Sequence, residues 1–330
     1  MNALYDVAAI GNAIVDVIAP AGDDLLAREQ LSKGSMILID QPRAEALYGA
    51  MAAGEEHSGG SAGNTIAGLA SFGGKGAFIG KVAADALGEI YTHDMRALGA
   101  HFATAPLTNG TATGRCLINV TPDGERTMAT FLGAAGEIDD DDVDATVIEA
   151  SKTVYLEGYL FDPPGARRAF AKAAGLAHGA GRLIALSLSD AFVVDRHRET
   201  LLGFIETQVD ILFANEGEIC SLFQTDDFAA AAAAMRGKVR IAALTRGAMG
   251  SVVLSADGDH TVAAEPVVGR VVDTTGAGDQ YAAGFLFGLA GGRSLDICGR
   301  LGGLAAAEVI AHYGPRPDVS LRDLAAARGL

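Results

Sequence analysis

The sequence predicts an α/β fold in which helices cover both faces of a mainly parallel central sheet and a small β-sheet forms a lid. From about residue 150 onward, short apolar runs alternate with longer helical stretches, as in a parallel sheet built from strand–helix units. Most of the apolar runs are continuous, which is typical of strands buried on both faces. Two further strand-like segments flank Pro122-Asp123-Gly124-Glu125, which is a strong hairpin signal.

Composition narrows the class of protein. The 330 residues suit one large domain with an insertion, and we predict a single domain over residues 1–330. With 49% hydrophobic residues, 43 glycines and no tryptophan, the chain is core-forming and rich in turns. A net charge of −16 argues against nucleic acid and anionic membranes as partners. Three widely spaced cysteines and a start with neither a basic segment nor a long apolar run predict a cytoplasmic protein with reduced thiols.

The elements of the central sheet follow from the apolar pattern. Its strands are expected near residues 7–10, 77–79, 153–156, 183–188, 211–214 and 241–244. Helices are expected up to residue 72 and near residues 166–178, 199–207, 216–223 and 227–235. The lid strands are expected within about residues 14–40 and 112–132, at 14–18, 35–39, 114–121 and 126–132.

Polar side chains follow the first predicted strand. Asn12 and Asp16 come directly after residues 7–10, and ligand sites in open α/β sheets lie at the carboxyl ends of strands. Both could bind vicinal sugar hydroxyls, although such residues are also common turn formers. Gly59-Gly60 would let the backbone approach a ligand, and Asn64 lies near the start of the following helix. Paired glycines are by themselves weak evidence, because most of them only form turns.

Asn215 and Glu218 allow two interpretations. Asn215 follows the strand at 211–214 and can cap the next helix, with Glu218 completing a capping box. The functional alternative is that both hold Mg²⁺ through water near phosphates, since Mg²⁺ keeps several waters and needs few protein carboxylates. Thr245 and Gly247 end the next strand, where a turn could hold a nucleotide.

The most informative stretch runs from Val271 to Phe285. Two β-branched residues end a strand, a turn rich in Thr and Gly follows, and an apolar helix begins at about Gly276. Free amides and the positive end of the helix dipole make this start an anion site. Asp279 is expected one turn into the helix, where a carboxylate is better explained as a base beside a phosphoryl group than as a helix-stabilising residue.

Several common motifs are absent from the sequence. It contains neither G-x-x-x-x-G-K-[ST] nor G-x-G-x-x-G, which excludes a P-loop kinase and argues against a dinucleotide oxidoreductase. Its seven histidines have no metal-ligand spacing.

Asp273-Thr274-Thr275-Gly276-Ala277-Gly278-Asp279 resembles the C-terminal signature of the PfkB (ribokinase-like) carbohydrate and nucleoside kinases. The resemblance covers almost the whole chain, because Asn12 with Asp16, Gly59-Gly60 with Asn64, and Asn215 with Glu218 occur in family order. Residues 112–116, 155–159, 186–192 and 209–216 are most similar to adenosine kinases.

The resemblance implies a role for each matching residue. Asp279 would be the catalytic base. The amides of Gly276, Ala277 and Gly278 would form an anion hole, and Arg126 on the lid would help to stabilise charge on the phosphoryl group. The substrate would be held by Asn12, Asp16, Gly59, Gly60, Asn64 and Tyr159. The nucleotide would be bound by Asn215, Thr245, Gly247, Ala306 and Ile310, and Glu218 would organise Mg²⁺ through water.

The resemblance therefore implies an ATP- and Mg²⁺-dependent kinase acting on a primary hydroxyl, with adenosine as the first choice of acceptor. A sugar kinase of the same family is the alternative, because it would share these residues and because Tyr159 is followed by Leu160 where adenosine kinases usually have an aromatic pair. A non-catalytic ligand-binding regulator is a distant alternative. A monovalent cation and the choice between monomer and homodimer stay open.

Overall fold

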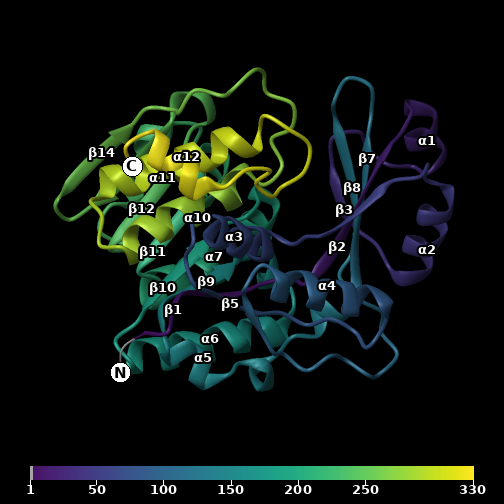
Figure 1. Ribbon diagram of the computed structural model, residues 1–330, viewed down its shortest axis with the longest axis horizontal. Coiled ribbons are helices and arrows are strands. Elements are labelled where there is room, and N and C mark those ends of the chain that lie inside the picture. The colour runs from purple at the N-terminus through teal and green to yellow at the C-terminus, as the bar shows by residue number, and fades with distance from the viewer. Residues whose placement is uncertain (1–2) are drawn as a thin grey trace.

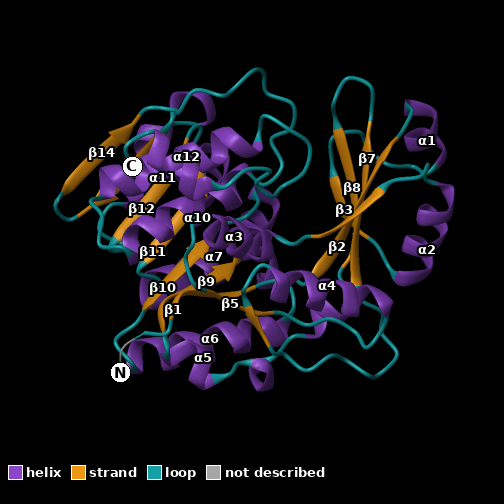
Figure 2. Cartoon of the chain, viewed as in Figure 1, coloured by secondary structure: helices purple, strands orange, loops and turns teal. Residues whose placement is uncertain are grey.

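The computed structural model describes residues 3–330, within which the strands form a nine-stranded and a five-stranded sheet (Figure 1 and Figure 2). The strands of the large sheet are β1 (Tyr5–Ile10), β5 (Gly76–Ile79), β6 (His101–Phe102), β9 (Ser151–Glu157), β10 (Leu183–Ser187), β11 (Ile211–Asn215), β12 (Ile241–Thr245), β13 (Ser251–Ser255) and β14 (Gly258–Val262). Their order is β14-β13-β12-β11-β10-β9-β1-β5-β6.

Pairing in the large sheet is parallel from β6 to β12, and it is antiparallel between β12, β13 and β14. This confirms the predicted mainly parallel sheet. The β13–β14 hairpin was not predicted. Its outer strand has the sequence GDHTV and is mostly exposed, so it carries no continuous apolar run that would indicate a strand.

Helices cover both faces of the large sheet. On one face lie α5 (Ala145–Glu149), α6 (Pro164–Gly179), α7 (Ala191–Gln208), α8 (Glu216–Phe223) and α9 (Phe228–Met235). On the other face lie α3 (Ser61–Ser71), α4 (Ala86–Ala97), α10 (Ala277–Ala290) and α11 (Leu295–Val309), with α12 (Leu321–Ala327) packed against α3 and α11. Short 3₁₀ helices occur at Gly133–Glu137, Asp140–Asp142, Gly158–Phe161 and Gly247–Met249.

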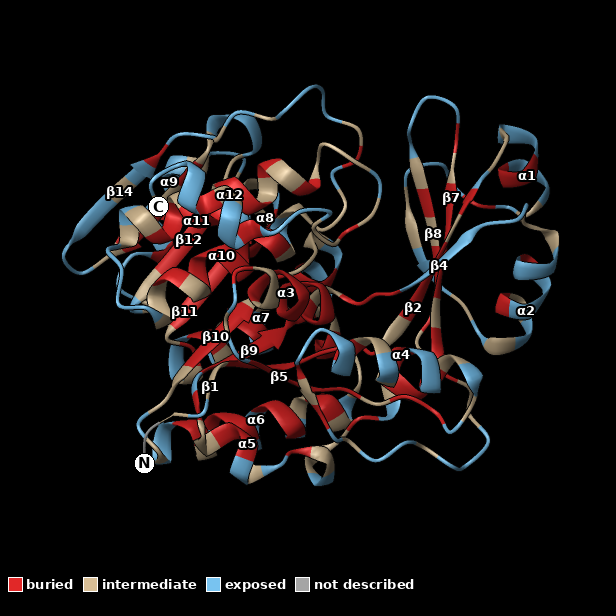
Figure 3. Cartoon of the chain, in the orientation of Figure 1, coloured by how far each residue is buried: buried red, intermediate tan, exposed pale blue. Residues whose placement is uncertain are grey.

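Alternate residues of each strand point into the two helix layers. In β1, Ala8 and Ile10 belong to one hydrophobic cluster, and Val7 and Ala9 belong to the other. Figure 3 shows the buried residues concentrated along the strands and the helix faces that cover them. Among residues 3–330, no helix has the length and apolar character needed to cross a membrane.

One helix is much longer than predicted. The helix expected at residues 199–207 begins at Ala191, because the Asp190 side chain accepts a hydrogen bond from Phe192 N (2.7 Å) and caps the helix there. The first turn contains Val193 and Val194, and β-branched residues are weak helix formers. Both are fully buried, so packing rather than propensity stabilises this turn.

The small sheet is formed by β2 (Ile14–Pro20), β3 (Met36–Leu38), β4 (Glu55–Ser58), β7 (Gly114–Val120) and β8 (Arg126–Phe131). Its order is β3-β8-β7-β2-β4. Four of these strands lie where lid strands were expected. The edge strand β4 was missed, since its sequence EEHS is polar and largely exposed.

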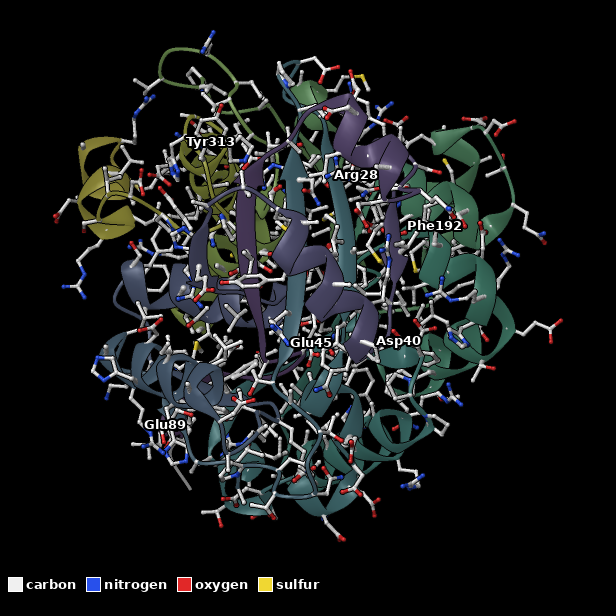
Figure 4. The ribbon with its side chains drawn as sticks, turned by 90° about the vertical axis from the view of Figure 1, so that its right-hand side faces the viewer. Arg28, Asp40, Glu45, Glu89, Phe192 and Tyr313 are labelled. Carbon is white, nitrogen blue, oxygen red and sulfur yellow. The ribbon has the colours of Figure 1, made fainter. Side chains whose placement is uncertain are left out.

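Helices α1 (Asp23–Arg28) and α2 (Gln41–Ala50) cover the outer face of the small sheet. Leu26 and Leu47 of these helices pack against Val17, Leu117 and Ala129 of the strands. Figure 4 views this side and shows both helices lying across the sheet, with their polar residues outermost. These two helices do not cover the inner face of the small sheet, which faces the large sheet.

Candidate active site

A cavity of about 340 Å³ lies between the carboxyl ends of the large sheet's strands and the inner face of the small sheet. Of the predicted site residues, those that line it are Asn12, Asp16, Gly60, Asn64, Tyr159, Asn215, Glu218, Thr245, Gly276, Ala277, Gly278 and Asp279. The other predicted residues are not among the described residues that line it: Gly59, Arg126, Gly247, Ala306 and Ile310. The structure therefore brings together residues from both ends of the chain at one edge of the sheet.

Asp279 lies in the first turn of α10, as its third residue, and not one turn into the helix as expected. Two side chains of α3 hold its carboxylate. Ser61 Oγ donates to Asp279 Oδ1 at 2.6 Å, and Asn64 Nδ2 donates to Asp279 Oδ2 at 3.1 Å. Burial raises the pKa of Asp279 to about 6, and the two hydrogen bonds, which favour the charged form, limit that rise. Asp279 is therefore ionised and able to accept a proton at neutral pH.

The contact with Ser61 was not predicted, and Asn64 was assigned to substrate hydroxyls. In the structure the Asn64 amide nitrogen is used by Asp279, while Asn64 Oδ1 is buried without a hydrogen-bond partner. Ser61 is the first residue of α3 and follows the N-cap residue Gly60, and nothing in this local sequence indicates a partner at Asp279.

The start of α10 is shaped to receive an anion. Gly276 is the N-cap residue with φ +77°, and a Cβ on it would lie 2.7 Å from Pro315, so only glycine fits. No side chain caps the helix, and Ala277 N donates only a long bond to Thr274 O (3.3 Å). The amides of the first turn are available to a ligand, and the helix dipole favours a negative charge there.

Arg126 reaches the loop before α10, but not the cavity. It forms an ion pair with Asp273, whose carboxylate also accepts from Thr275 N (3.0 Å) and Gly314 N (3.2 Å). Arg126 Nη1 is buried without a hydrogen-bond partner. A direct role for Arg126 at the phosphoryl group stays a prediction, and it would require a rearrangement of this ion pair.

Asp16 is a buried carboxylate aimed into the cavity. It is 6% exposed, and within residues 3–330 it has no side-chain hydrogen bond and no ion pair within 4.0 Å. A Cβ on Gly59 would lie 2.2 Å from Asp16 Oδ2, so Gly59 makes room for this carboxylate without lining the cavity. Burial raises the pKa of Asp16 to about 7, against the opposing charge of Arg316. An unpartnered buried carboxylate of this kind fits a ligand with hydroxyl donors.

Glu157 is a cavity residue that the sequence analysis missed. It ends β9 and accepts from Asn12 Nδ2 (2.6 Å), Asn12 N (3.2 Å) and Ala62 N (2.9 Å). Burial raises its pKa to about 7, and these hydrogen bonds limit the rise. Because Glu157 bonds only the Asn12 nitrogen atoms, Asn12 Oδ1 is buried with no hydrogen-bond partner among residues 3–330 and is free for a ligand hydroxyl. The position of Glu157 at the end of an apolar strand was the signal that could have found it.

Asn215 and Glu218 form the capping box that was one of the two predicted alternatives. Asn215 Oδ1 accepts from Glu218 N (2.8 Å), and Glu218 Oε2 accepts from Asn215 N (2.9 Å). Burial raises the pKa of Glu218 to about 7. No group of three His, Cys, Asp or Glu side chains able to hold a metal ion occurs in the described chain. A cation here would depend on water and on the phosphates of a ligand.

The wall opposite these polar groups is apolar. The side chains that form it come from alternate positions of β3, β7 and β8 and from the residue after β8: Met36, Leu38, Cys116, Ile118, Met128 and Leu132. The cavity thus has a polar end, at Asn12, Asp16 and Asp279, and an apolar wall on the small sheet. A ligand that fills it must have two chemically different parts.

The fold and this site define a phosphotransferase: an anion site at a helix start adjoins an ionised carboxylate and a pocket for a hydroxyl-bearing molecule. The chain belongs to the pfkB family of carbohydrate kinases, whose family model matches residues 7–321. It is a kinase with a ribokinase-like fold, as predicted. Membership of the family implies ATP as co-substrate, usually with Mg²⁺, and a nucleoside or a sugar as acceptor.

Similar proteins include both nucleoside and sugar kinases. The crystal structure of an adenosine kinase from Sinorhizobium meliloti is 51% identical, with a TM-score of 0.93, and 99% of each chain is covered. That of a probable sugar kinase from Rhizobium etli CFN 42 is 48% identical, with a TM-score of 0.95 and the same coverage. An adenosine kinase of Saccharomyces cerevisiae is 27% identical over 328 residues, covering 93% of this chain and 95% of the relative.

Proposed function

We propose that this kinase transfers the γ-phosphoryl group of ATP to the primary hydroxyl of a nucleoside, with adenosine as the expected acceptor. The observation that carries the proposal is the division of the cavity into a polar end and an apolar wall. A nucleoside matches this division, because its ribose carries hydroxyls and its base has apolar faces. A free sugar carries hydroxyls all round and would leave some of them unpaired against Met36, Ile118 and Met128.

Bound in this way, the acceptor would present its hydroxyls to Asp16 and Asn12 and its 5′-hydroxyl to Asp279. Asp279 would take the proton as the hydroxyl oxygen attacks the γ-phosphorus and the bond from that phosphorus to the ADP oxygen breaks. The hydrogen bonds from Ser61 and Asn64 fix the direction of the Asp279 carboxylate. Most of the rate enhancement would then come from positioning and from the dipoles of the α10 start, as is usual in phosphoryl transfer.

The residues available for ATP and Mg²⁺ fit such ligands. Free amides at the start of α10 suit a phosphate, and Thr245 lines the cavity on the side of Asn215 and Glu218. Glu218 and Asn215 would hold Mg²⁺ through water, and the ion would neutralise charge on the phosphates. The predicted adenine-pocket residues Gly247, Ala306 and Ile310 lie outside the described cavity lining, so their role stays a prediction.

Replacing Glu218 by glutamine is expected to raise the Mg²⁺ concentration for half-maximal rate by about tenfold, because one negative charge is lost near the cation. Glutamine can keep the capping box with Asn215, so the fold of α8 should be unchanged. A Mg²⁺ titration of initial rates at saturating ATP measures the effect. An unchanged Mg²⁺ requirement would leave Glu218 with only its capping role.

A panel of acceptors tests the proposed function directly. We expect ATP consumption with Mg²⁺ to be fastest with adenosine and slower with inosine, guanosine and cytidine. With ribose, fructose and 2-keto-3-deoxygluconate we expect kcat/KM at least about 10²-fold lower, the cost of unpaired buried polar groups. Efficient turnover of a free sugar would instead favour the sugar-kinase alternative, which the Rhizobium etli relative supports. Lack of turnover with every acceptor would favour a non-catalytic regulator.

A further inference from the structure

Gln280, the residue after Asp279, is fully buried and does not line the cavity. Its Nε2 donates to two backbone carbonyls, Asn64 O at 3.0 Å and Pro315 O at 2.9 Å. These acceptors belong to α3 and to the loop that follows α11. One side-chain amide therefore connects α10 to two other elements at the level of the predicted base.

Both contacts lie where the backbones approach closely. A Cβ on Gly68 would lie 2.0 Å from Gln280 Oε1, so the absence of a side chain on α3 makes room for the amide. A Cβ on Gly276 would lie 2.7 Å from Pro315, the same residue whose carbonyl Gln280 binds. The amide thus ties the first turn of α10 to α3 on one side and to the loop behind the anion site on the other.

The residue that Gln280 holds on α3 is the one that contacts the base. Asn64 O accepts from Gln280, and the Asn64 side chain donates to Asp279 Oδ2. These two hydrogen bonds restrain each other, because both involve Asn64 of α3 and because Asp279 and Gln280 are adjacent in α10. The amide satisfies both carbonyls, whereas a carboxylate has no N–H to donate and an apolar side chain would leave both carbonyls without this partner. Its own Oε1 is buried and has no hydrogen-bond partner among residues 3–330.

We propose that Gln280 is a positioning residue for phosphoryl transfer, which fixes α3 and the loop at Pro315 against α10 so that Asn64 and Ser61 orient the Asp279 carboxylate. The proposal rests on the assignment of Asp279 as the base made under the proposed function. Gln280 itself touches no reacting atom. Its effect on the rate passes entirely through the geometry of its neighbours.

Gln280→Met tests the proposal, because methionine has a similar length and no N–H donor. We expect kcat to fall by about 10- to 10²-fold, as for a small misplacement of a catalytic group, with little change in either KM. The acid limb of the kcat profile, measured at saturating acceptor so that the titration of Asp16 does not contribute through KM, should move to higher pH by roughly half a unit or more, because weakening the Asn64 bond removes stabilisation of the ionised carboxylate. The other carboxyl groups that interact electrostatically with Asp279, which are Asp16, Glu157 and Glu218, are not altered in this variant.

Two further variants keep the test decisive. Gly68→Ala adds a Cβ that would lie 2.0 Å from Gln280 Oε1 and 2.8 Å from Ala283 Cβ, so it displaces the Gln280 amide and pushes α3 away from α10 at this point. It should reproduce the shift of the acid limb even if Gln280→Met folds poorly. Ser151→Ala is the control for effects that come only from a loss of folded protein. It removes the buried hydrogen bond from Ser151 Oγ to Val147 O, at the other end of β9. It should leave the pH profile unchanged.

The shift of the acid limb separates the possible outcomes. A rate that falls equally at every pH in both Gln280→Met and Gly68→Ala, in proportion to the folded fraction, would overturn the proposal and make Gln280 merely structural. A wild-type enzyme without turnover on any acceptor would refute the proposed function instead. The two failures are therefore distinguishable in the same set of measurements.

Discussion

Replacing Asp279 by asparagine is expected to lower kcat by about 10³-fold or more, the upper part of the range for a lost general base. Asparagine keeps the size of the side chain and can still accept from Ser61, while the Asn64 amide can turn to present its free Oδ1. The site is therefore preserved and only the proton acceptor is lost. KM for both substrates should change little, and steady-state kinetics with saturating Mg²⁺ measure the effect.

The same variant should be more stable than the wild-type protein at neutral and alkaline pH. The folded-state pKa of Asp279 is raised from 3.8 to about 6. The stability associated with its protonated form is therefore complete below about pH 4 and is lost as pH rises through about 6. Asparagine avoids that loss. The gain should grow from pH 4 to pH 7 and reach on the order of 3 kcal/mol, a few degrees in Tm by thermal denaturation.

Asp296→Asn is the matched control. Asp296 lies in the first turn of α11, as Asp279 does in α10, but it is exposed and does not line the described cavity. Its replacement should leave kcat unchanged and destabilise slightly through the helix dipole, by about 0.3–1 kcal/mol. An Asp279→Asn enzyme with near-normal kcat would refute the assignment of the base, whatever its stability.

The residues that converge on the cavity could be predicted because they follow strands. Asn12 and Asn215 directly follow or end apolar strands, and the carboxyl ends of parallel strands meet at one edge of the sheet. Gly276 and Asp279 were predicted from a turn rich in glycine at a helix start, which favours anion binding. The strand expected to end at Val271-Val272 was wrong, because residues 271–276 form an irregular loop and turn. These inferences needed only local patterns.

The hydrogen bonds that organise the same residues could not be predicted. Ser61 and Asp279 are 218 residues apart, and Asn12 and Glu157 are 145 residues apart. Which donor meets which carboxylate depends on how α3 packs against α10 and β1 against β9, and no local pattern contains that information. The prediction for Arg126 shows the same limit, because the sequence does not reveal that the carboxylate of Asp273 lies closer to it than the cavity does.

Two of the missed strands and the missed start of α7 show why local pattern was not enough. β4 and β14 are edge strands with polar, exposed residues, so their extended form comes from pairing with β2 and β13 and not from an apolar pattern. The start of α7 was missed for the opposite reason. Val193 and Val194 favour a strand, and their burial makes this segment helical. Tertiary contacts override local preference in each case.

Replacing Asp16 by asparagine is expected to raise KM for the acceptor by about 10²-fold, because charge-assisted hydrogen bonds to its hydroxyls are weakened or lost. In the free enzyme this buried carboxylate has no hydrogen-bonding side-chain partner among residues 3–330, so its bonding capacity is reserved for the ligand. Its loss should affect binding more than chemistry. KM for ATP and kcat should therefore change much less, in contrast to Asp279→Asn.

The pH dependence of acceptor binding should identify Asp16 in the wild-type enzyme. Its pKa is raised to about 7, and the acceptor's hydroxyls favour the ionised form. KM for the acceptor should therefore fall as pH rises from about 6 to 8, and this dependence should disappear in Asp16→Asn. Asp6→Asn is the control. Asp6 lies near the start of β1, at the end of that strand far from Asn12, where it binds Lys152 and Lys75 N. This variant should retain the pH dependence of KM for the acceptor. If Asp16→Asn keeps both the affinity for the acceptor and its pH dependence, the carboxylate does not bind the acceptor, and the polar end of the cavity must use Asn12 and Glu157 instead.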